Sequence, residues 1–151
     1  MAVWKKTIAS LEEMENLAAT IGSYLQPPDV LTLEGDLGAG KTTFAKALAK
    51  SIGVTRTVSS PTFTIIKQYE GNYLLNHLDV YRLADSEEDL GWNELFYGDA
   101  ISIIEWAQFI EEELPEQRLD IIIYRTGETT RTVEVKPKGE HFIRMCEEIF
   151  T

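Results

Sequence analysis

A glycine-rich segment in the first third of the chain limits the folds that this sequence can adopt. It reads Gly35-Asp36-Leu37-Gly38-Ala39-Gly40-Lys41-Thr42, which fits the phosphate-binding pattern G-x-x-x-x-G-K-[ST] at every position. Glycines allow backbone N–H groups to turn inward around phosphate oxygens, and the helix expected to begin near Lys41 adds its positive N-terminal end. The segment therefore predicts a nucleotide-binding α/β protein.

The side chains of this segment indicate how a nucleotide would be held. Lys41 is expected to reach the β- and γ-phosphates, and the Thr42 hydroxyl is expected to bind Mg²⁺. We predict that the loop and the start of its helix contact ATP. The predicted contact residues are Asp36, Leu37, Gly38, Ala39, Gly40, Lys41, Thr42 and Thr43.

The residues on both sides of this turn have the periodicities of regular structure. Ser10 and Glu13 form the pattern of a capping box, and the helix that follows is expected to end before Pro27-Pro28. A strand at 30–34 precedes the turn and a helix at 41–52 follows it, as the phosphate-binding motif requires. Later patterns predict strands at 63–69, 73–78, 100–104, 119–124 and 132–135, and helices at 85–90, 106–114 and 140–150.

This order of elements predicts the P-loop NTPase three-layer fold, with a mixed, mainly parallel central sheet. The strands at 63–69 and 73–78 flank Glu70-Gly71-Asn72 and are expected to form an antiparallel hairpin. Because the chain has 151 residues and no repeat or long linker, we expect residues 1–151 to form one domain.

The charge balance argues against direct contact with nucleic acid. The chain carries 25 acidic and 14 basic side chains, for a formal net charge of −11, and Lys5-Lys6 is its only adjacent basic pair. Such a surface repels phosphates, so we expect no DNA binding and only indirect contact with tRNA. A protein partner with a basic face is the better match.

Cysteine content and hydropathy indicate the cellular compartment in which the protein is expected. Cys146 is the only cysteine, so no internal disulfide can form, and we expect it to be a small buried side chain. The N-terminus lacks the pattern of a secretory signal, and no apolar run approaches the roughly 20 residues that span a bilayer. We expect a cytoplasmic protein without a membrane anchor.

Two carboxylates are candidates for the second magnesium ligand. Asp79 and Glu105 each follow a predicted strand, where phosphoryl-transfer sites place a carboxylate that holds the metal or its waters. The more apolar strand before Glu105 slightly favours that residue, and both could serve. His77 could be a general base, although a histidine within a strand is more often structural.

Two further features are candidates for sensing or neutralising phosphate. Ser60, Pro61 and Thr62 lie between the phosphate-binding helix and the hairpin, where a switch-like loop would lie in chain order. Arg82 and Arg131 could neutralise phosphate charge. In an acidic protein, however, a surface ion pair is the commoner role for a single arginine.

Two nucleotide-dependent classes lack support in this sequence. A GTPase needs D-x-x-G and N-K-x-D, but no aspartate here is followed three residues later by glycine, and Asn76-His77-Leu78-Asp79 lacks the lysine. A small-molecule kinase needs an arginine-bearing lid, and the acidic stretch 85–99 contains no arginine.

Several motifs in order resemble the TsaE (YjeE) family of bacterial ATPases. The resemblance extends from about the first helix to the C-terminal strands, while the N-terminus and the last helix diverge. The motifs are Gly35 to Phe44, Ser60-Pro61-Thr62-Phe63, His77-Leu78-Asp79-Val80-Tyr81-Arg82-Leu83, Glu88-Asp89-Leu90-Gly91 with Glu94-Leu95-Phe96, and Ile104-Glu105-Trp106.

This resemblance implies an ATPase that supports threonylcarbamoyladenosine formation on tRNA and works with a TsaB–TsaD pair. It implies that Thr42 and Glu105 hold Mg²⁺ and that Asp79 has a Walker-B-like or water-orienting role, so that Lys41, Asp79 and Glu105 form the catalytic set. It also implies that Ser60, Pro61 and Thr62 form the switch loop. Leu11 would contact the base, and Trp106 and Arg131 would lie near the nucleotide.

Two alternatives remain open at this stage. A P-loop kinase acting on a small metabolite would consume ATP only when its acceptor is added. A nucleotide-gated binding module would bind a partner tightly with negligible turnover. Because no arginine finger is evident within the chain, an ATPase of this kind is expected to be slow alone and stimulated by partners.

Overall fold

The computed structural model describes residues 3–36, 38–58, 66–81 and 91–150. Leu37, Arg82, the expected switch loop at Ser60, Pro61 and Thr62, and the helix expected at 85–90 lie outside these ranges. The described elements are β1 (Trp4–Ile8), α1 (Leu11–Tyr24), β2 (Val30–Gly35), α2 (Lys41–Ser51), β3 (Ile66–Glu70), β4 (Leu74–Asp79), α3 (Trp92–Phe96), β5 (Ala100–Glu105), the 3₁₀ helix η2 (Ala107–Glu113), β6 (Arg118–Arg125), β7 (Arg131–Lys138) and α4 (Glu140–Phe150).

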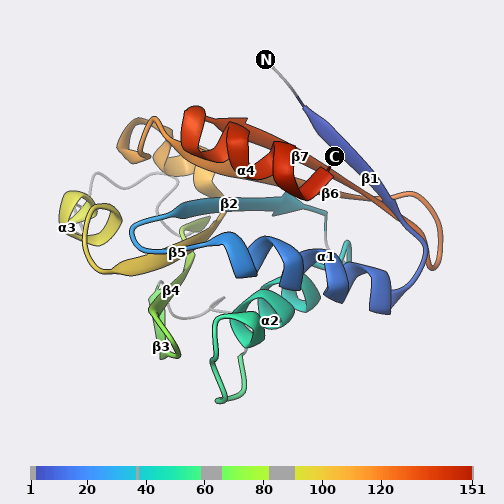
Figure 1. Ribbon diagram of the computed structural model, residues 1–151, viewed down its shortest axis with the longest axis horizontal. Coiled ribbons are helices and arrows are strands. Elements are labelled where there is room, and N and C mark those ends of the chain that lie inside the picture. Colours follow the sequence, from blue (N-terminus) through green and yellow to red (C-terminus); the bar gives the residue numbers. More distant parts are fainter. Residues whose placement is uncertain (1–2, 37, 59–65, 82–90, 151) are drawn as a thin grey trace.

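One seven-stranded sheet, in the order β1-β7-β6-β2-β5-β4-β3, organises these elements (Figure 1). The central strands β6, β2, β5 and β4 run parallel to one another, and antiparallel pairs complete both edges. The predicted mixed sheet with a mainly parallel centre and a β3–β4 hairpin is therefore confirmed. Because parallel strands end at the same edge of a sheet, the ends of β2, β4 and β5 meet where the phosphate loop begins.

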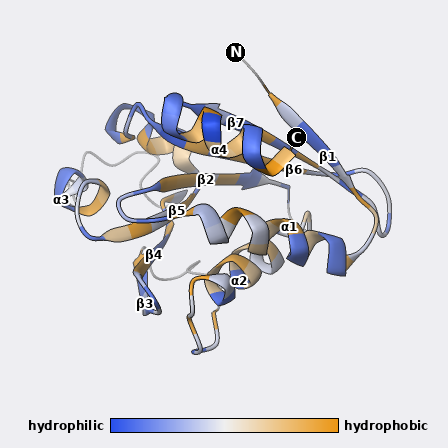
Figure 2. Ribbon diagram, viewed as in Figure 1, coloured by the Kyte–Doolittle hydropathy of each residue, from blue (hydrophilic) through white to orange (hydrophobic). Residues whose placement is uncertain are grey.

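Helices cover this sheet from both sides. Apolar side chains of α1, α2 and α4 pack with those of β2, β5, β6 and β7 in the larger core cluster, and α3 and η2 pack on the ends of β4 and β5 in a smaller one. Figure 2 shows β2 as hydrophobic along most of its length, whereas α4 presents hydrophilic residues on its outer side. No helix among the described residues is long and apolar enough to cross a bilayer.

The N-terminal helix begins as its capping box predicts. Ser10 has extended backbone angles, and its hydroxyl accepts a hydrogen bond from the Glu13 amide at 3.2 Å. The Glu13 carboxylate accepts one in return from the Ala9 amide at 2.7 Å. The helix ends at Tyr24, ahead of Pro27-Pro28.

Three elements differ from the sequence-based expectations. β1 was not predicted, because an edge strand with two lysines among its five residues lacks a clear apolar alternation. The short helix α3 was also not predicted. The helix expected at 106–114 is instead a 3₁₀ helix from Ala107, and Trp106 has a left-handed backbone conformation with φ 63°.

Cys146 on α4 is fully buried, as expected, and burial raises the pKa of its thiol to about 11. We predict that dithionitrobenzoate labels the native protein at pH 8 on the order of a hundredfold more slowly than the urea-unfolded protein, because the thiolate is the reactive form. The unfolded chain loses this proton first, so the free energy of unfolding should fall as pH rises from 9.0 towards about 11. Equal labelling rates for both states would contradict this prediction.

Candidate functional site

The phosphate loop connects the end of β2 to the start of α2. Gly38 and Gly40 have φ values of 80° and 112°, a left-handed conformation that glycine adopts without strain. The Ala39 amide donates to the Asp36 carbonyl at 2.9 Å, which closes the turn. At Gly35, a Cβ atom would lie 2.8 Å from the Ile123 carbonyl oxygen, so the loop can leave the sheet here only without a side chain. Backbone conformation therefore favours glycine at positions 38 and 40, and the close approach of Ile123 favours it at position 35.

Lys41 and Glu105 meet beside this loop. The Lys41 amino group lies 3.8 Å from Oε1 of Glu105 and 5.1 Å from the centre of the Trp106 ring. The side chains of Lys41 and Glu105 are 17% and 8% exposed, so this ion pair is largely shielded from water. Trp106 directly follows β5 and has a left-handed backbone conformation, and its ring lies against Lys41.

Asp79 and Glu105 end adjacent parallel strands in matching register. Both carboxylates are buried, and Oδ1 of Asp79 accepts a hydrogen bond from the Tyr81 amide at 3.0 Å. Glu105 is the carboxylate that faces Lys41, while Asp79 lies one strand further from the loop. This arrangement favours Glu105 for the position nearest the phosphates.

His77 provides the second partner of Glu105. Its Nε2 atom lies 2.8 Å from Oε2 of Glu105, and both side chains are buried. The two oxygens of Glu105 thus have different neighbours, Lys41 on one side and His77 on the other. Sequence reasoning weighed His77 as a general base or a structural residue, but only the pairing of β4 with β5 brings it to Glu105.

A pocket of about 480 Å³ opens on the other side of the phosphate loop. Arg131 lines it together with the start of α1, and Leu11, the residue expected to contact the base, lies at its wall with 64% of its surface exposed. Sequence reasoning missed Met14, Glu128 and Thr129, because their link to the site depends on how α1 and the β6–β7 turn pack. The lining residues are Ile8, Ala9, Ser10, Leu11, Met14, Gly38, Ala39, Gly40, Thr43, Glu128, Thr129 and Arg131.

Arg131 bonds the phosphate loop to the β6–β7 turn. Its guanidinium donates to the carbonyls of Ala39 and Gly38 at 2.9 and 3.3 Å, and to three carbonyls of the turn, those of Gly127, Glu128 and Thr130. Within the described ranges, the partners of this arginine are main-chain carbonyls and not the acidic side chain of a surface ion pair. Its fork of N–H donors matches a group of main-chain oxygens instead.

We predict that Arg131→Ala weakens ATP binding about tenfold, because the loop carbonyls lose their donors and the loop loses its fixed shape. Titration with a fluorescent ATP analogue measures this change. Arg131→Lys keeps the charge without the fork, so it should bind ATP nearly as weakly as Arg131→Ala. Arg144→Ala, which removes an exposed arginine from α4, should bind ATP as the unaltered protein does. Full affinity in Arg131→Lys would show that charge alone matters.

The half-buried Trp106 ring beside Lys41 is joined by the exposed rings of Tyr81 and Phe109. Tyr81 packs edge-on against Trp106 and Phe109, with ring centres 5.0 and 5.7 Å apart, and the rings of Trp106 and Phe109 are stacked at 6.0 Å. A hollow of about 160 Å³ lies next to this group and is lined by Asp36, Lys41 and Trp106, among others. Asp36 is exposed at its rim.

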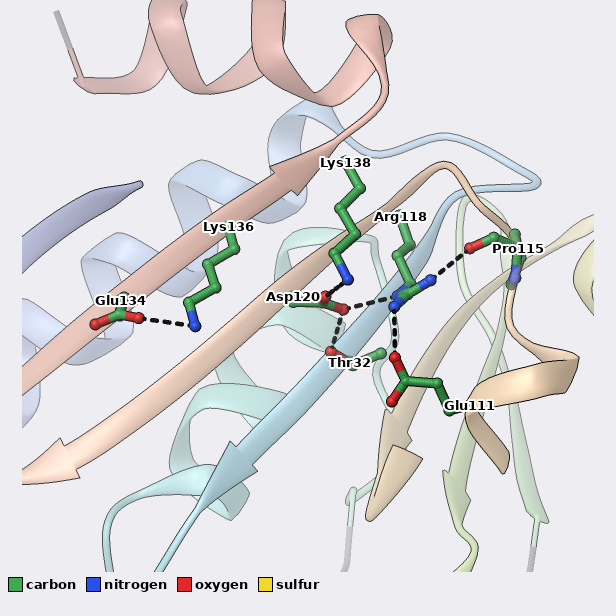
Figure 3. Close-up of polar contacts among 8 residues, drawn as sticks. All are labelled: Thr32, Glu111, Pro115, Arg118, Asp120, Glu134, Lys136 and Lys138. Carbon is green, nitrogen blue, oxygen red and sulfur yellow. Dashed lines mark hydrogen bonds and ion pairs between the residues drawn. The ribbon is translucent and has the colours of Figure 1, made fainter. Parts of the chain in front are cut away.

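A polar cluster fastens η2 to the sheet (Figure 3). Arg118 donates to Asp120 at 3.0 Å and to the Pro115 carbonyl at 2.9 Å, and it lies 3.5 Å from Glu111 of η2. The Thr32 hydroxyl donates to the same Asp120 oxygen at 2.6 Å, and Lys138 pairs with Asp120 at 3.1 Å. Because η2 follows Trp106 directly, this cluster holds the segment that carries Glu105 and Trp106.

Comparison with known proteins adds independent information. The family described as "Threonylcarbamoyl adenosine biosynthesis protein TsaE" matches residues 8–133. The protein named tRNA threonylcarbamoyladenosine biosynthesis protein TsaE in Bacillus subtilis (strain 168) is 50% identical over 139 residues, which cover 91% of this chain and 88% of the relative. Its namesake in Treponema pallidum (strain Nichols) is 37% identical over 128 residues, covering 83% of this chain and 95% of the relative.

A solved structure is also similar to this chain. The crystal structure of Bacillus subtilis YdiB superposes on this chain with a TM-score of 0.86 and 42% sequence identity. The match covers 98% of this chain and 94% of that chain.

Proposed function

Because the chain belongs to the TsaE family of threonylcarbamoyladenosine biosynthesis proteins, we propose that it is a Mg²⁺-dependent ATPase that supports this modification of tRNA. ATP hydrolysis would be coupled to turnover of a TsaB–TsaD complex. The observation that carries the proposal is the shielded Lys41–Glu105 pair, 3.8 Å apart, at the point where a full phosphate-binding loop meets the end of β5. In this pair, Lys41 would serve as the cation for the phosphates and Glu105 as the carboxylate for the metal.

The chain's own residues account for the steps of binding. The backbone N–H groups of the loop and the N-terminus of α2 hold the phosphates, and Lys41 turns from Glu105 to the β- and γ-phosphates. When Lys41 leaves, Oε1 of Glu105 loses its partner and would be available as a Mg²⁺ ligand when ATP binds. Asp79, on the adjacent strand, would orient water or help to hold Mg²⁺. Lys41, Asp79 and Glu105 are thus the proposed catalytic set.

The donor atoms at this site fit Mg²⁺. Thr42, Glu105 and Asp79 offer a hydroxyl and carboxylate oxygens, the hard ligands that Mg²⁺ prefers. Within the described part of the chain, no three His, Cys, Asp or Glu side chains cluster tightly enough to hold a metal alone. Mg²⁺ sites commonly use one or two carboxylates together with nucleotide phosphates. When bound, Mg²⁺ would neutralise charge on the β- and γ-phosphate oxygens.

The 480 Å³ pocket is the proposed site for adenosine. It adjoins the phosphate loop, and Leu11 and Met14 of α1 offer apolar surface to a base. The missing guanine motifs favour adenine over guanine. Thr43 and Arg131 lie on the side of the pocket next to the loop.

The partner assignment rests on family membership and charge. With a net charge of −11, the chain suits a protein partner with a basic face better than RNA, so contact with tRNA would be indirect and DNA is not a ligand. Residues 1–151 would act as one domain in the cytoplasm, with Ser60, Pro61 and Thr62 as the switch loop.

The deciding experiment measures phosphate release from ATP by the purified protein, alone, with a TsaB–TsaD pair, and with the pair plus tRNA. Slow release that rises with the pair supports the proposal. Turnover only with an added small-molecule acceptor would indicate a kinase. Tight, ATP-dependent binding to the pair without phosphate release would indicate a nucleotide-gated binding module.

A further inference from the structure

We propose that His77 is a positioning residue that fixes the Glu105 carboxylate at the phosphate loop. This inference rests on the proposed function, because it concerns how the chain prepares Glu105 for Mg²⁺ and ATP. It assigns a role to a side chain that would not itself touch the nucleotide.

The sheet register brings the two residues together. In the parallel β4–β5 pair, His77 lies opposite Ile103 and Asp79 lies opposite Glu105, so His77 and Glu105 are diagonal neighbours on one face of the sheet. Nε2 of His77 lies 2.8 Å from Oε2 of Glu105, and the two side chains are 2% and 8% exposed. Water therefore competes little for this bond.

The bond determines where the other carboxylate oxygen points. A carboxylate only accepts hydrogen bonds, so Nε2 of His77 carries the proton that is shared with Oε2. With Oε2 held, the planar carboxylate directs Oε1 towards Lys41, 3.8 Å away. Since Nε2 is engaged in this way, the geometry favours a positioning role for His77 over the role of a free general base.

Packing alone does not explain an imidazole at this position. Nδ1 of His77 is buried, and no residue in the described ranges offers it a hydrogen-bond partner. A buried polar atom without a partner lowers stability, and an apolar side chain of similar size would fill the space without that cost. What the imidazole adds over such a side chain is its directed bond to Glu105.

The test compares His77→Leu, which removes the donor, with His77→Gln, whose amide nitrogen can replace Nε2. Ser102→Ala is the matched control, because Ser102 is equally buried on β5 and its hydroxyl also has no partner among the described residues. Circular dichroism and thermal unfolding establish that each variant folds. Two readouts follow: binding of Mn²⁺ to the ADP complex by electron paramagnetic resonance, and the kcat and KM of ATP hydrolysis.

We expect His77→Leu to weaken Mn²⁺ binding and to lower kcat, each by about tenfold or more, with KM for ATP nearly unchanged. His77→Gln should recover most of both quantities, and Ser102→Ala should match the unaltered protein. Wild-type Mn²⁺ affinity in folded His77→Leu would overturn the inference, and so would a His77→Gln variant as impaired as His77→Leu. If His77→Leu does not fold, the comparison of His77→Gln with Ser102→Ala decides: wild-type-like Mn²⁺ affinity in His77→Gln supports the inference, and a tenfold loss overturns it.

The Mn²⁺ measurement also separates this inference from the proposed function. A protein that binds Mn²⁺ and ADP through a His77-dependent site but releases no phosphate would contradict the ATPase proposal and leave the positioning role supported.

Discussion

Lys41→Ala is expected to lower ATP affinity by at least about a hundredfold, because it removes the only side-chain cation that the P-loop motif directs at the β- and γ-phosphates. Among the residues that the structure describes, the Lys41 amino group has no hydrogen-bond partner: it lies 3.8 Å from Glu105 and against the Trp106 ring. It can therefore turn to phosphate without breaking a close hydrogen bond. The loss is measured by titration with a fluorescent ATP analogue and by the rise in melting temperature that ATP produces.

Lys46→Ala is the matched control for this variant. Lys46 lies on the same helix with an exposed side chain, so its removal changes the net charge equally without touching the phosphate loop. It should bind ATP as the unaltered protein does. If Lys41→Ala bound ATP within about threefold of the unaltered protein, the loop would not be the phosphate site.

Glu105→Gln is expected to separate binding from hydrolysis. Glutamine keeps the size of the side chain and can still accept a hydrogen bond from His77, but it lacks the charge that holds Mg²⁺. We expect ATP hydrolysis to fall by at least about a hundredfold while ATP affinity stays within a few-fold of normal or rises. Affinity can rise because Lys41 no longer has a carboxylate partner that competes with phosphate. Phosphate release and ATP titration on the same preparation provide both values.

Asp79→Asn completes this comparison. Asp79 ends the strand next to Glu105, and its carboxylate already accepts the Tyr81 amide, so we expect a smaller loss of hydrolysis than in Glu105→Gln. A larger loss in Asp79→Asn would reverse the order of the two carboxylates in the metal site. Magnesium-dependent hydrolysis that survives both substitutions would show that the metal site lies elsewhere.

Together these variants discriminate among the three functions considered. Lys41→Ala removes nucleotide binding in an ATPase, a kinase or a binding module alike, so it tests only the phosphate site. Glu105→Gln affects partner-stimulated hydrolysis in an ATPase, but in a binding module it would leave ATP-dependent association with the TsaB–TsaD pair intact. A kinase would show the loss only in the presence of its acceptor.

The local patterns of the sequence predicted much of the central fold. The strands at 30–34 and 100–104 lie within one residue of β2 and β5, and the capping box located the start of α1. These predictions hold because apolar strands and capped helices are determined by neighbours along the chain. β1 was not predicted because it lies at the sheet edge and pairs with β7, which is more than a hundred residues away along the chain.

The sequence by itself determined where phosphate would bind, since the glycines, Lys41, Thr42 and the flanking strand and helix are contiguous and their spacing carries the chemistry. Only the tertiary structure decided which carboxylate faces Lys41, that His77 holds that carboxylate, and that Arg131 bonds to Ala39 from 92 residues away. The physical reason is that these contacts depend on strand order and register. Strand order and register come from the packing of the whole sheet, so no short segment of the chain encodes them.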